Sequence, residues 1–460
     1  MKDVNKEVPV KLGQQIELTI DGYGHDGEGV GRFRDFTIFV PEVLKDERVL
    51  VKISEVKRNF GRGVVSRIIQ SASERTTPLC NVANTCGGCQ LQHLNYPDQL
   101  KQKQQRVIDA VERIGGLRDV VIHPVLGMND PWHYRNKGQY PFGIENTAVV
   151  MGFYRKGTHR IVPLEECLLQ TETTNRIARK LRMLVEKYQV AIYQEQDHGG
   201  LLRHVLLKQA AQTKDVMVVF ITNGEQFPAA EKIAHELADE FPEIKGVVQN
   251  INLTSGNVIL GSRTKFILGL DTITDRIGRF KFTIAAESFF QVNSLQTEVL
   301  YRKTVEFANL SGVETVLDAY CGVGSLTLFL AEKAKKVYGI EIVAGAVRNA
   351  NRNAELNEVH NAQFVTGSTE KVLPQLVKSG INFQVGVVDP PRSGCEEAVL
   401  KSLAENKVGR IVYVSCNPST LSRDLKILDG LGYKTVEIQP VDMFPQTYHV
   451  ECVAKIERGN

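Results

Sequence analysis

Residues 283–460 alternate short apolar runs with longer helical patterns, and this alternation restricts the possible folds more than any other feature of the chain. It is typical of a doubly wound, largely parallel β-sheet with helices between the strands. The runs expected to form strands are Val316–Tyr320, Lys336–Ile340, Ala362–Val365, Val385–Val388, Arg410–Val414 and Lys434–Ile438. We therefore predict an α/β fold for this part of the chain.

Three of these strands end abruptly in polar, glycine or proline residues. Val316–Tyr320 precedes Cys321-Gly322-Val323-Gly324, Val385–Val388 precedes Asp389-Pro390-Pro391-Arg392, and Ile411–Val414 precedes Ser415-Cys416-Asn417-Pro418. Ligands of such sheets bind at the carboxyl ends of the strands, so we expect the three ends to share one cleft. Cys416 is then a candidate reactive thiol, although a free cysteine is as often a small core residue.

The glycine-containing segment after the first strand predicts a nucleoside site. Gly322 to Thr327 follows the strand and opens a helix, and Glu341 ends the next strand, where a carboxylate can accept ribose hydroxyls. A dinucleotide fingerprint would have Gly or Ala at Thr327, so NAD is disfavoured. A nucleoside ligand without a pyrophosphate, such as S-adenosylmethionine, fits better.

The amino-terminal region predicts a small β-barrel. Short β-rich runs over Gln15–Ile20, Phe36–Val40 and Arg48–Ile53 are separated by glycine-containing turns. Four to five strands in about sixty residues is the size of an OB-like barrel. Basic residues gather between Arg48 and Arg75, and Phe33, Phe36 and Phe60 are candidates for stacking on bases. A solvated basic face explains the same composition equally well.

Three cysteines follow within ten residues, in the pattern Cys80-x5-Cys86-Gly87-Gly88-Cys89. The glycines permit a tight turn that lets the three sulphurs converge, and Cys167 is the best candidate for a fourth ligand. Four thiolates suit either zinc or an iron–sulphur cluster, and spacing alone slightly favours zinc. Unconnected cysteines remain an alternative.

The middle of the chain predicts a mixed α+β domain. Helices are expected over Tyr96–Gly115 and Thr171–Tyr188, and a buried strand over Val216–Ile221. Tyr134-Arg135-Asn136-Lys137 interleaves aromatic and basic groups, as Phe153–Lys156 does. Such patches are found in RNA-binding surfaces and also on solvated edge strands.

The totals indicate a soluble protein. Apolar residues make up 42% of the 460 residues and charged residues 24%, and the net charge of +3 neither requires nor excludes nucleic acid. We find no apolar run long enough to span a bilayer and no signal peptide, so we predict a cytoplasmic, monomeric enzyme with no membrane partner.

Five motifs in order make the chain resemble the RNA uracil-5-methyltransferases. They are Phe289-Phe290-Gln291-Val292-Asn293, Asp318–Gly324, Asp389-Pro390-Pro391-Arg392, Ser415-Cys416-Asn417-Pro418 and His449-Val450-Glu451. The resemblance covers nearly the whole chain. It is strongest to the branch that methylates 23S ribosomal RNA and carries a [4Fe–4S] cluster.

This resemblance implies a domain order and two cofactors. It implies a TRAM domain over 1–72, an OB-like RNA-binding barrel. A central domain with the cluster motif would follow over 73–275, and a Rossmann-like S-adenosylmethionine-dependent methyltransferase domain over 276–460. It also implies that the predicted helix over 96–115 packs on the catalytic domain. The cofactors would be S-adenosylmethionine and a [4Fe–4S] cluster.

The resemblance also assigns roles to residues. Cys416 is implied as the nucleophile that adds to uridine C6, and Glu451 as the base that removes the C5 proton. The implied cofactor-binding residues are Gln291, Tyr320, Gly322, Glu341 and Asp389, and the implied cluster ligands, in place of zinc, are Cys80, Cys86, Cys89 and Cys167. Phe289 or Phe290 is expected to stack on the flipped base.

Other activities and targets stay open at this point. The uridine can lie in transfer RNA, as in uridine-54 methylation, instead of ribosomal RNA, and one or two sites can be modified. Cytosine C5 methylation would use Cys395 as its thiol. Amino-group methylation also uses Asp-Pro-Pro, but usually with an aromatic residue where Arg392 stands. An RNA-binding or assembly protein with incidental methylation is the remaining alternative.

Overall fold

A computed structural model describes residues 8–288 and 290–459 of the chain. The chain divides into two compact units, which are described separately. The first comprises residues 1–99, 155–158 and 446–448, and the second comprises 100–154, 159–445 and 449–460. Among the described residues, no helix is long and apolar enough to cross a membrane.

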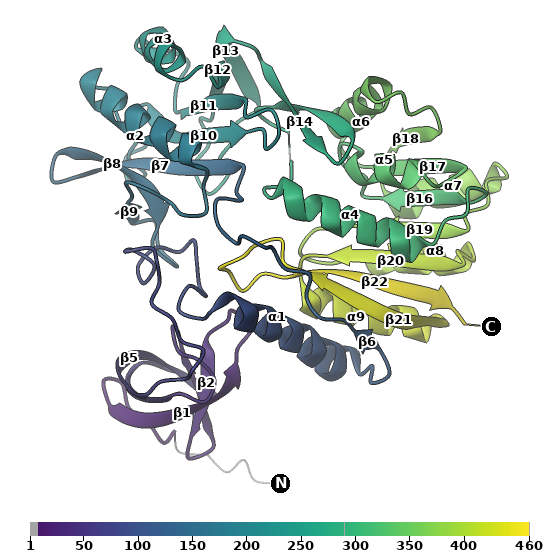
Figure 1. Cartoon of the computed structure of the whole chain (residues 1–460), viewed down its shortest axis with the longest axis horizontal. Coiled ribbons are helices and arrows are strands. Elements are labelled where there is room, and N and C mark those ends of the chain that lie inside the picture. The colour runs from purple at the N-terminus through teal and green to yellow at the C-terminus, as the bar shows by residue number, and fades with distance from the viewer. Residues whose placement is uncertain (1–7, 289, 460) are drawn as a thin grey trace. The chain divides into compact units, whose positions relative to one another are not determined.

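The first unit contains a closed five-stranded barrel, which confirms the prediction for this region (Figure 1). The strand order is β1-β2-β3-β5-β4, with bounds β1 (Gln15–Tyr23), β2 (Gly29–Phe33), β3 (Phe36–Val40), β4 (Arg48–Val56) and β5 (Phe60–Gln70). Alternate residues of β1 point inward, so Ile16, Leu18 and Ile20 are buried. Gly31 lets β2 approach β1 closely, because a Cβ there would lie 2.4 Å from the Thr19 carbonyl oxygen.

The barrel core contains one residue that we had predicted to stack on RNA bases. Phe36 is buried with Ile38 and Val40 in this core, so its ring is not available to a base. The prediction was wrong for Phe36 because it begins a strand in which every second residue faces inward. Phe33 and Phe60 are only partly buried.

The second unit begins with a seven-stranded sheet in the order β13-β12-β11-β10-β7-β8-β9. The bounds are β7 (Lys137–Glu145), β8 (Ala148–Tyr154), β9 (Ile161–Pro163), β10 (Leu202–Gln209), β11 (Val216–Thr222), β12 (Ile244–Ile251) and β13 (Arg263–Gly269). Helices α2 (Glu172–Lys187) and α3 (Ala230–Glu240) pack on one face of this sheet and share its hydrophobic core (Figure 1). The Thr171 hydroxyl caps α2 by accepting a hydrogen bond from the Thr174 N–H.

The second sheet of this unit has eight strands in the order β18-β17-β16-β19-β20-β22-β21-β6. The bounds are β6 (Val121–Ile122), β16 (Thr315–Ala319), β17 (Lys336–Glu341), β18 (Ala362–Thr366), β19 (Val385–Val388), β20 (Arg410–Ser415), β21 (Tyr433–Val441) and β22 (Glu451–Arg458). A two-stranded ribbon of β14 (Thr272–Ile277) and β15 (Phe280–Ala285) precedes it in the chain.

The α/β fold class is confirmed, but the strand β22 was not predicted. It lies between β20 and β21 and pairs antiparallel with both, whereas β16 to β20 are parallel. Its sequence Glu451–Arg458 mixes apolar and charged residues, so it lacks the continuous apolar run by which the other strands were recognised. The insertion of β22 brings Glu451 to the edge of the sheet where β20 ends.

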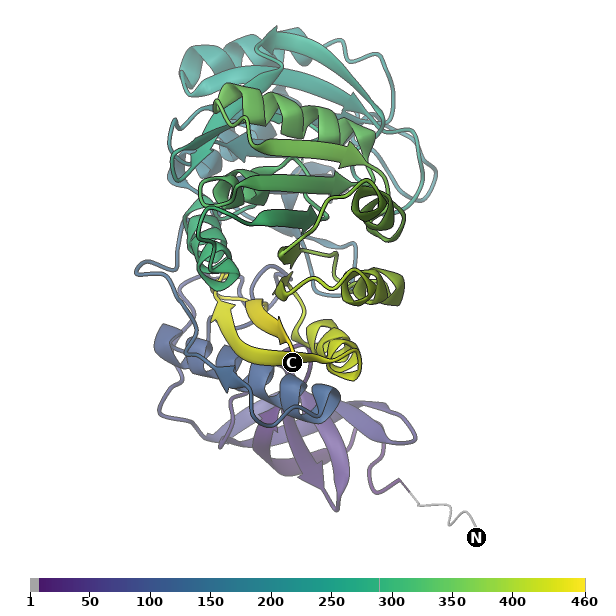
Figure 2. The same cartoon turned by 90° about the vertical axis from the view of Figure 1, so that its right-hand side faces the viewer.

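Helices cover both faces of the eight-stranded sheet (Figure 2). One face packs against α7 (Thr369–Lys378), α8 (Glu397–Glu405) and α9 (Pro418–Gly430), together with Val107 and Val111. The other face packs against α4 (Ser294–Ala308), α5 (Ser325–Ala331) and α6 (Ala344–Leu356). The helix predicted over Tyr96–Gly115 is α1 (Tyr96–Ala110) followed by a π-turn, η1 (Val111–Gly115).

Candidate functional site

The predicted active-site residues gather at the carboxyl edge of the eight-stranded sheet. Ala319 of β16 is in register with Ile340 of β17 and with Val388 of β19. Tyr413 of β20 is in turn in register with Val388. Glu341, Asp389 and Cys416 therefore emerge along one edge, as parallel pairing of strands with polar ends requires.

Strand register places Cys416 opposite Glu451. The last paired residues of β20 and β22 are Ser415 and Cys452. Cys416 follows the first of these and Glu451 precedes the second, so in an antiparallel pair the next opposed positions are Cys416 and Glu451. The two residues implied for covalent attack and proton removal are thus neighbours at the ends of adjacent strands, and the charge of Glu451 acts on the Cys416 thiol.

The groups around Cys416 hold their protons more tightly than they would in water. Burial, and then the nearby carboxyl groups of Glu451 and Asp389, raise the pKa of the Cys416 thiol to about 11. Burial, and then the charge of Asp389, raise the pKa of Glu451 to about 8. Burial raises the pKa of Asp389 to about 7. At neutral pH the thiol and Glu451 are therefore mainly protonated, and Asp389 carries most of the negative charge.

Arg392 is the cation of this site, and sequence reasoning gave it no role. Its charge lowers the pKa of both Cys416 and Glu451, against the dominant effect of burial. Its backbone carbonyl accepts hydrogen bonds of 3.3 Å from Asn417 Nδ2 and from Thr420 Oγ1, which join its loop to the start of α9. The feature of the sequence that could have pointed to Arg392 is the proline pair before it, because two prolines fix a rigid turn, which here lies beside the thiol.

The loop after β16 has the shape required for a bound nucleoside. Gly322 has φ of 56°, and a Cβ at this position would enter open space. Glu341 accepts hydrogen bonds from the Gly322 N–H at 3.2 Å and the Val343 N–H at 2.8 Å, which bring its carboxylate beside the loop. Ile342, directly after it, is 69% exposed and offers an apolar face. These residues fit an adenosine group: a carboxylate for the ribose, open space beside Gly322 and an apolar surface.

Two residues of the Asp318–Gly324 motif are unusual. Tyr320 has a φ of 67°, which a residue with a side chain rarely adopts, and such strain concentrates at functional sites. Burial, and then the neighbouring Cys395, raise the pKa of the Tyr320 hydroxyl group. Asp318 Oδ1 is buried without a hydrogen-bond partner among the described residues, while Oδ2 accepts from Thr327 Oγ1 at 2.5 Å. Burial raises the pKa of Asp318 to about 7.

The segment that carries Gln291 joins β15 to α4. The backbone carbonyl of Gln291 accepts a 2.8 Å hydrogen bond from Asn136 Nδ2. Phe290 packs against Phe282 and lies beside the apolar core, with the ring centroids 6.0 Å apart. Phe289 lies outside the described residues. The stacking role proposed for Phe289 or Phe290 stays a prediction.

Cys395, the thiol of the cytosine alternative, is a structural residue in this fold. It is buried, and its backbone N–H donates to Asp424 Oδ2 at 2.8 Å and to the Tyr413 hydroxyl at 3.0 Å. Burial raises the pKa of its thiol to about 12. A buried thiol enclosed by Tyr413, Asp424 and Tyr320 is poorly placed for attack on a base.

The cysteine motif lies on a loop of the first unit, whereas Cys167 belongs to the second. In the loop, the Gly88 N–H donates to Cys86 Sγ at 3.4 Å, and the Cys80 N–H donates to Gln92 Oε1 at 3.2 Å. Cys167 is fixed by Asn175, which bonds both its N–H and its carbonyl. Over residues 8–288 and 290–459, no group of three or more His, Cys, Asp or Glu side chains is arranged to hold a metal ion.

Some basic residues of the barrel are paired with carboxylates, and others are exposed and unpaired among the described residues. Arg75 and Arg62 form ion pairs with buried carboxylates, at 2.6 Å to Glu47 and 2.8 Å to Glu28. Lys52, Arg58 and Arg67 are exposed and form no ion pair with described residues. Only part of the basic run Arg48–Arg75 is therefore available to phosphates.

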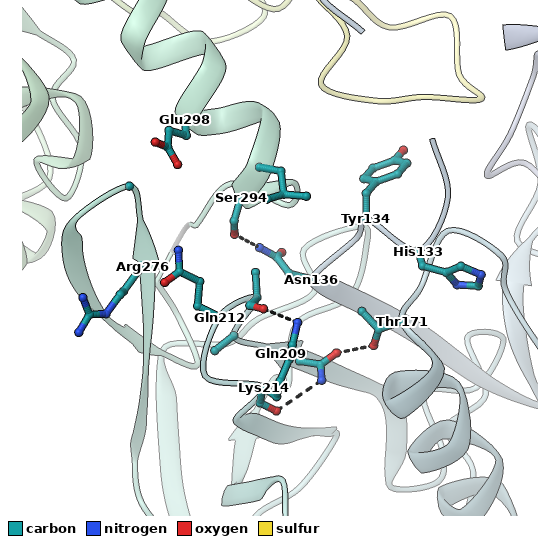
Figure 3. A pocket seen from close by; sticks show the side chains of 14 residues that line it. His133, Tyr134, Asn136, Thr171, Gln209, Gln212, Lys214, Arg276, Ser294 and Glu298 are labelled. Atoms are coloured by element: carbon teal, nitrogen blue, oxygen red, sulfur yellow. Dashed lines mark hydrogen bonds between the residues drawn. The ribbon is translucent and has the colours of Figure 1, made fainter. Parts of the chain in front are cut away.

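A separate pocket of about 180 Å³ lies in the second unit between the end of β10, the start of α4 and the turn joining β14 to β15 (Figure 3). None of the predicted site residues lines it. Its wall includes Asn136 and Ser294, whose side chains are hydrogen bonded to each other at 2.9 Å. Gln209 lies near Thr171 on the opposite side.

The chain is similar in sequence and fold to known RNA methyltransferases. A family model described as tRNA (uracil-5-)-methyltransferase matches residues 95–458, and a TRAM domain model matches residues 9–66. An uncharacterized RNA methyltransferase of Bacillus cereus is 49% identical over 446 residues, 97% of each chain, and one of Clostridium tetani is 45% identical over 98% of each. The crystal structure of Pyrococcus abyssi tRNA (uracil-54, C5)-methyltransferase in complex with S-adenosyl-L-homocysteine matches with a TM-score of 0.77. The two sequences are 30% identical, and the match covers 96% of this chain and 100% of the Pyrococcus abyssi chain.

Proposed function

We propose that this chain, which belongs to the tRNA (uracil-5-)-methyltransferase family and carries a TRAM domain, methylates uridine C5 in RNA. We propose 23S ribosomal RNA as the substrate because the motifs and the four cysteines of the chain resemble most those of the branch that methylates this RNA. The methyl donor in this proposal is S-adenosylmethionine, with its adenosine at Gly322 and Glu341, and with Gln291, Tyr320 and Asp389 as further cofactor contacts. The observation that carries the proposal is the register of β20 and β22: its last pair, Ser415 and Cys452, adjoins the Cys416 thiol and the Glu451 carboxyl group, which lie close enough for Glu451 to raise the pKa of the thiol.

The chemistry of the uracil ring explains why a thiol and a base are both needed. Uracil C5 is too weakly nucleophilic to take a methyl group directly. When the Cys416 sulphur bonds to C6, the C5=C6 double bond opens and electron density moves to C5 as an enolate. S-adenosylmethionine, when bound, supplies an electrophilic methyl group. Glu451 then takes the remaining C5 proton, the ring double bond re-forms, and the C6–sulphur bond breaks.

Two neighbouring groups, Asp389 and Arg392, act on the first of these steps. Cys416 must lose a proton as its sulphur attacks, and Asp389 is the neighbouring group that is most ionised at neutral pH. Arg392 favours the thiolate by its positive charge. The target atom lies within the stack of an RNA helix, so the uridine has to be flipped out or lie in a loop.

Mapping of 5-methyluridine tests the proposed target. In a strain that lacks the gene, mass spectrometry of 23S ribosomal RNA fragments is expected to show the loss of one or two 5-methyluridines, and re-expression is expected to restore them. Loss confined to position 54 of transfer RNA would overturn the ribosomal target and support the tRNA alternative, which the likeness to the Pyrococcus abyssi enzyme favours. Loss of 5-methylcytidine or of a methylated amino group would overturn the reaction itself.

The exposed cations of the barrel are expected to contact RNA phosphates. Changing Lys52, Arg58 and Arg67 together to Gln should flatten the plot of log binding constant against log salt concentration by about 0.7 for each lost contact with single-stranded RNA. The measurement is RNA affinity between 50 and 200 mM salt, as an order-of-magnitude range over which such effects are visible. Arg48→Gln is the matched control, because Arg48 is paired with Glu17 at 2.7 Å. An unchanged slope in the triple variant would contradict the proposal.

We also propose that Cys80, Cys86, Cys89 and Cys167 hold a structural [4Fe–4S] cluster. The support is chemical: four thiolates suit such a cluster, and an N–H donor already faces Cys86 Sγ. No step of methyl transfer is assigned to it. Protein purified without oxygen should be brown and contain about four iron atoms per chain, as this cluster type requires, and Cys86→Ser should remove both the colour and the iron. Colourless protein with one tightly bound zinc would refute the assignment.

A further inference from the structure

Asn136 immediately precedes β7 and is far in the sequence from the segment that carries Gln291, yet it is bonded to that segment twice. Its backbone N–H donates to the Val292 carbonyl at 2.9 Å, and its Nδ2 donates to the Gln291 carbonyl at 2.8 Å. The same Nδ2 lies 2.9 Å from Ser294 Oγ (Figure 3). Asn136 is buried, so it belongs to the interior and not to the RNA-binding surface that its sequence context suggested.

Lys208 forms hydrogen bonds with the other end of the same segment. It lies on β10 and is buried, and its Nζ donates to the carbonyls of Ala285 at 2.7 Å and Ser288 at 2.8 Å. A buried ammonium group is costly unless it is fully hydrogen bonded, and here its partners are backbone carbonyls instead of a carboxylate. Burial and the nearby Lys137 lower its pKa to about 7.

A buried carboxylate supports the anchor at Asn136. Asp275 of β14 accepts hydrogen bonds from the backbone N–H groups of Ala211 and Gln212, and one from Ser294 Oγ at 3.2 Å. Asn293 then caps α4 by accepting from the Gln296 N–H at 3.2 Å. The start of α4 is therefore held by side chains of both the β14–β15 ribbon and the seven-stranded sheet.

The described residues between β15 and α4 form no helix or strand, so this segment has no backbone ladder to fix its path. Polar contacts from other elements have to do so. We propose that Asn136 and Lys208 are positioning residues, which clamp the two ends of this segment and thereby hold Gln291 in the geometry that binds S-adenosylmethionine. This inference rests on the proposed function, because it takes Gln291 to be a cofactor contact.

The proposal also gives the seven-stranded sheet a part in methyl transfer. Neither Asn136 nor Lys208 belongs to the eight-stranded sheet, yet the loss of either side chain is expected to weaken cofactor binding. A small displacement of a binding group is enough for this, since a shift of about 1 Å can cost about 100-fold in rate.

The test measures S-adenosylhomocysteine binding by calorimetry in Asn136→Ala and Lys208→Met. We expect the dissociation constant, and the KM for S-adenosylmethionine, to rise roughly 10- to 100-fold. RNA affinity should change by less than about two-fold, within the additivity expected of distant sites. Asn136→Gln and Lys208→Arg keep a hydrogen-bond donor at each position and should recover much of the binding. They provide a second test of the proposal if Asn136→Ala or Lys208→Met folds poorly.

Lys214→Met and Gln212→Ala are the matched controls. Lys214 lies on the same hairpin, and its Nζ also donates to a backbone carbonyl, that of Ala211, but neither side chain bonds any described residue of the segment that carries Gln291. Folded Asn136→Ala and Lys208→Met proteins that bind S-adenosylhomocysteine as tightly as these controls would overturn the positioning role and leave the proposed function intact. A wild-type protein that binds no S-adenosylhomocysteine would overturn both.

Discussion

Cys416→Ala is expected to bind S-adenosylhomocysteine and RNA normally but to transfer no methyl group. Removing the sulphur removes the only proposed route to electron density at C5, so the rate should fall at least about 10⁴-fold, as for other nucleophile deletions. The measurement uses RNA with 5-fluorouridine at the target position. Fluorine replaces the proton that must leave, so wild-type enzyme should remain bound to the RNA as an adduct that survives denaturation.

Cys395→Ala is the matched control for this experiment. Cys395 is buried against Tyr413 and Asp424, so its replacement is expected to lower stability slightly and leave adduct formation unchanged. If the adduct forms with Cys416→Ala and is lost with Cys395→Ala, then Cys395 is the nucleophile. That result would refute the mechanism proposed from the register of β20 and β22.

Glu451→Gln is expected to fail at a later step than Cys416→Ala. The amide cannot take the C5 proton, so the methyl group should be transferred and the enzyme should then stay covalently attached to ordinary, non-fluorinated RNA. Loss of a general base typically costs about 10²- to 10⁴-fold in turnover. Gel electrophoresis under denaturing conditions should show a methylated protein–RNA complex that wild-type enzyme does not accumulate.

The pH dependence of proton removal gives a second test of Glu451. A base must be ionised, and the pKa of Glu451 is raised to about 8 by burial and the charge of Asp389. The ionised fraction therefore grows as pH rises from 7 to 9, and the release of tritium from RNA containing [5-³H]uridine should accelerate over this range. Tritium release by Glu451→Gln at the wild-type rate, with the wild-type pH profile, would exclude Glu451 as the base.

The local pattern of the chain was sufficient to predict the two main folds and the edge of the sheet that forms the site. Apolar runs with polar ends indicate strands and their termini directly, because a strand that is covered on both faces needs consecutive apolar residues. The five-stranded barrel and the parallel strands β16 to β20 were predicted on this basis. The grouping of Glu341, Asp389 and Cys416 then follows from parallel pairing alone.

Tertiary structure decided which groups face one another and which are buried. Glu451 and Cys416 are opposed only because β22 inserts between β20 and β21, a long-range pairing that no local pattern of Glu451–Arg458 encodes. Burial of Phe36 and Asn136, and of the Lys208 ammonium group, likewise depends on elements distant in the sequence. The same residue types are common on surfaces, and only packing by distant segments removes them from water.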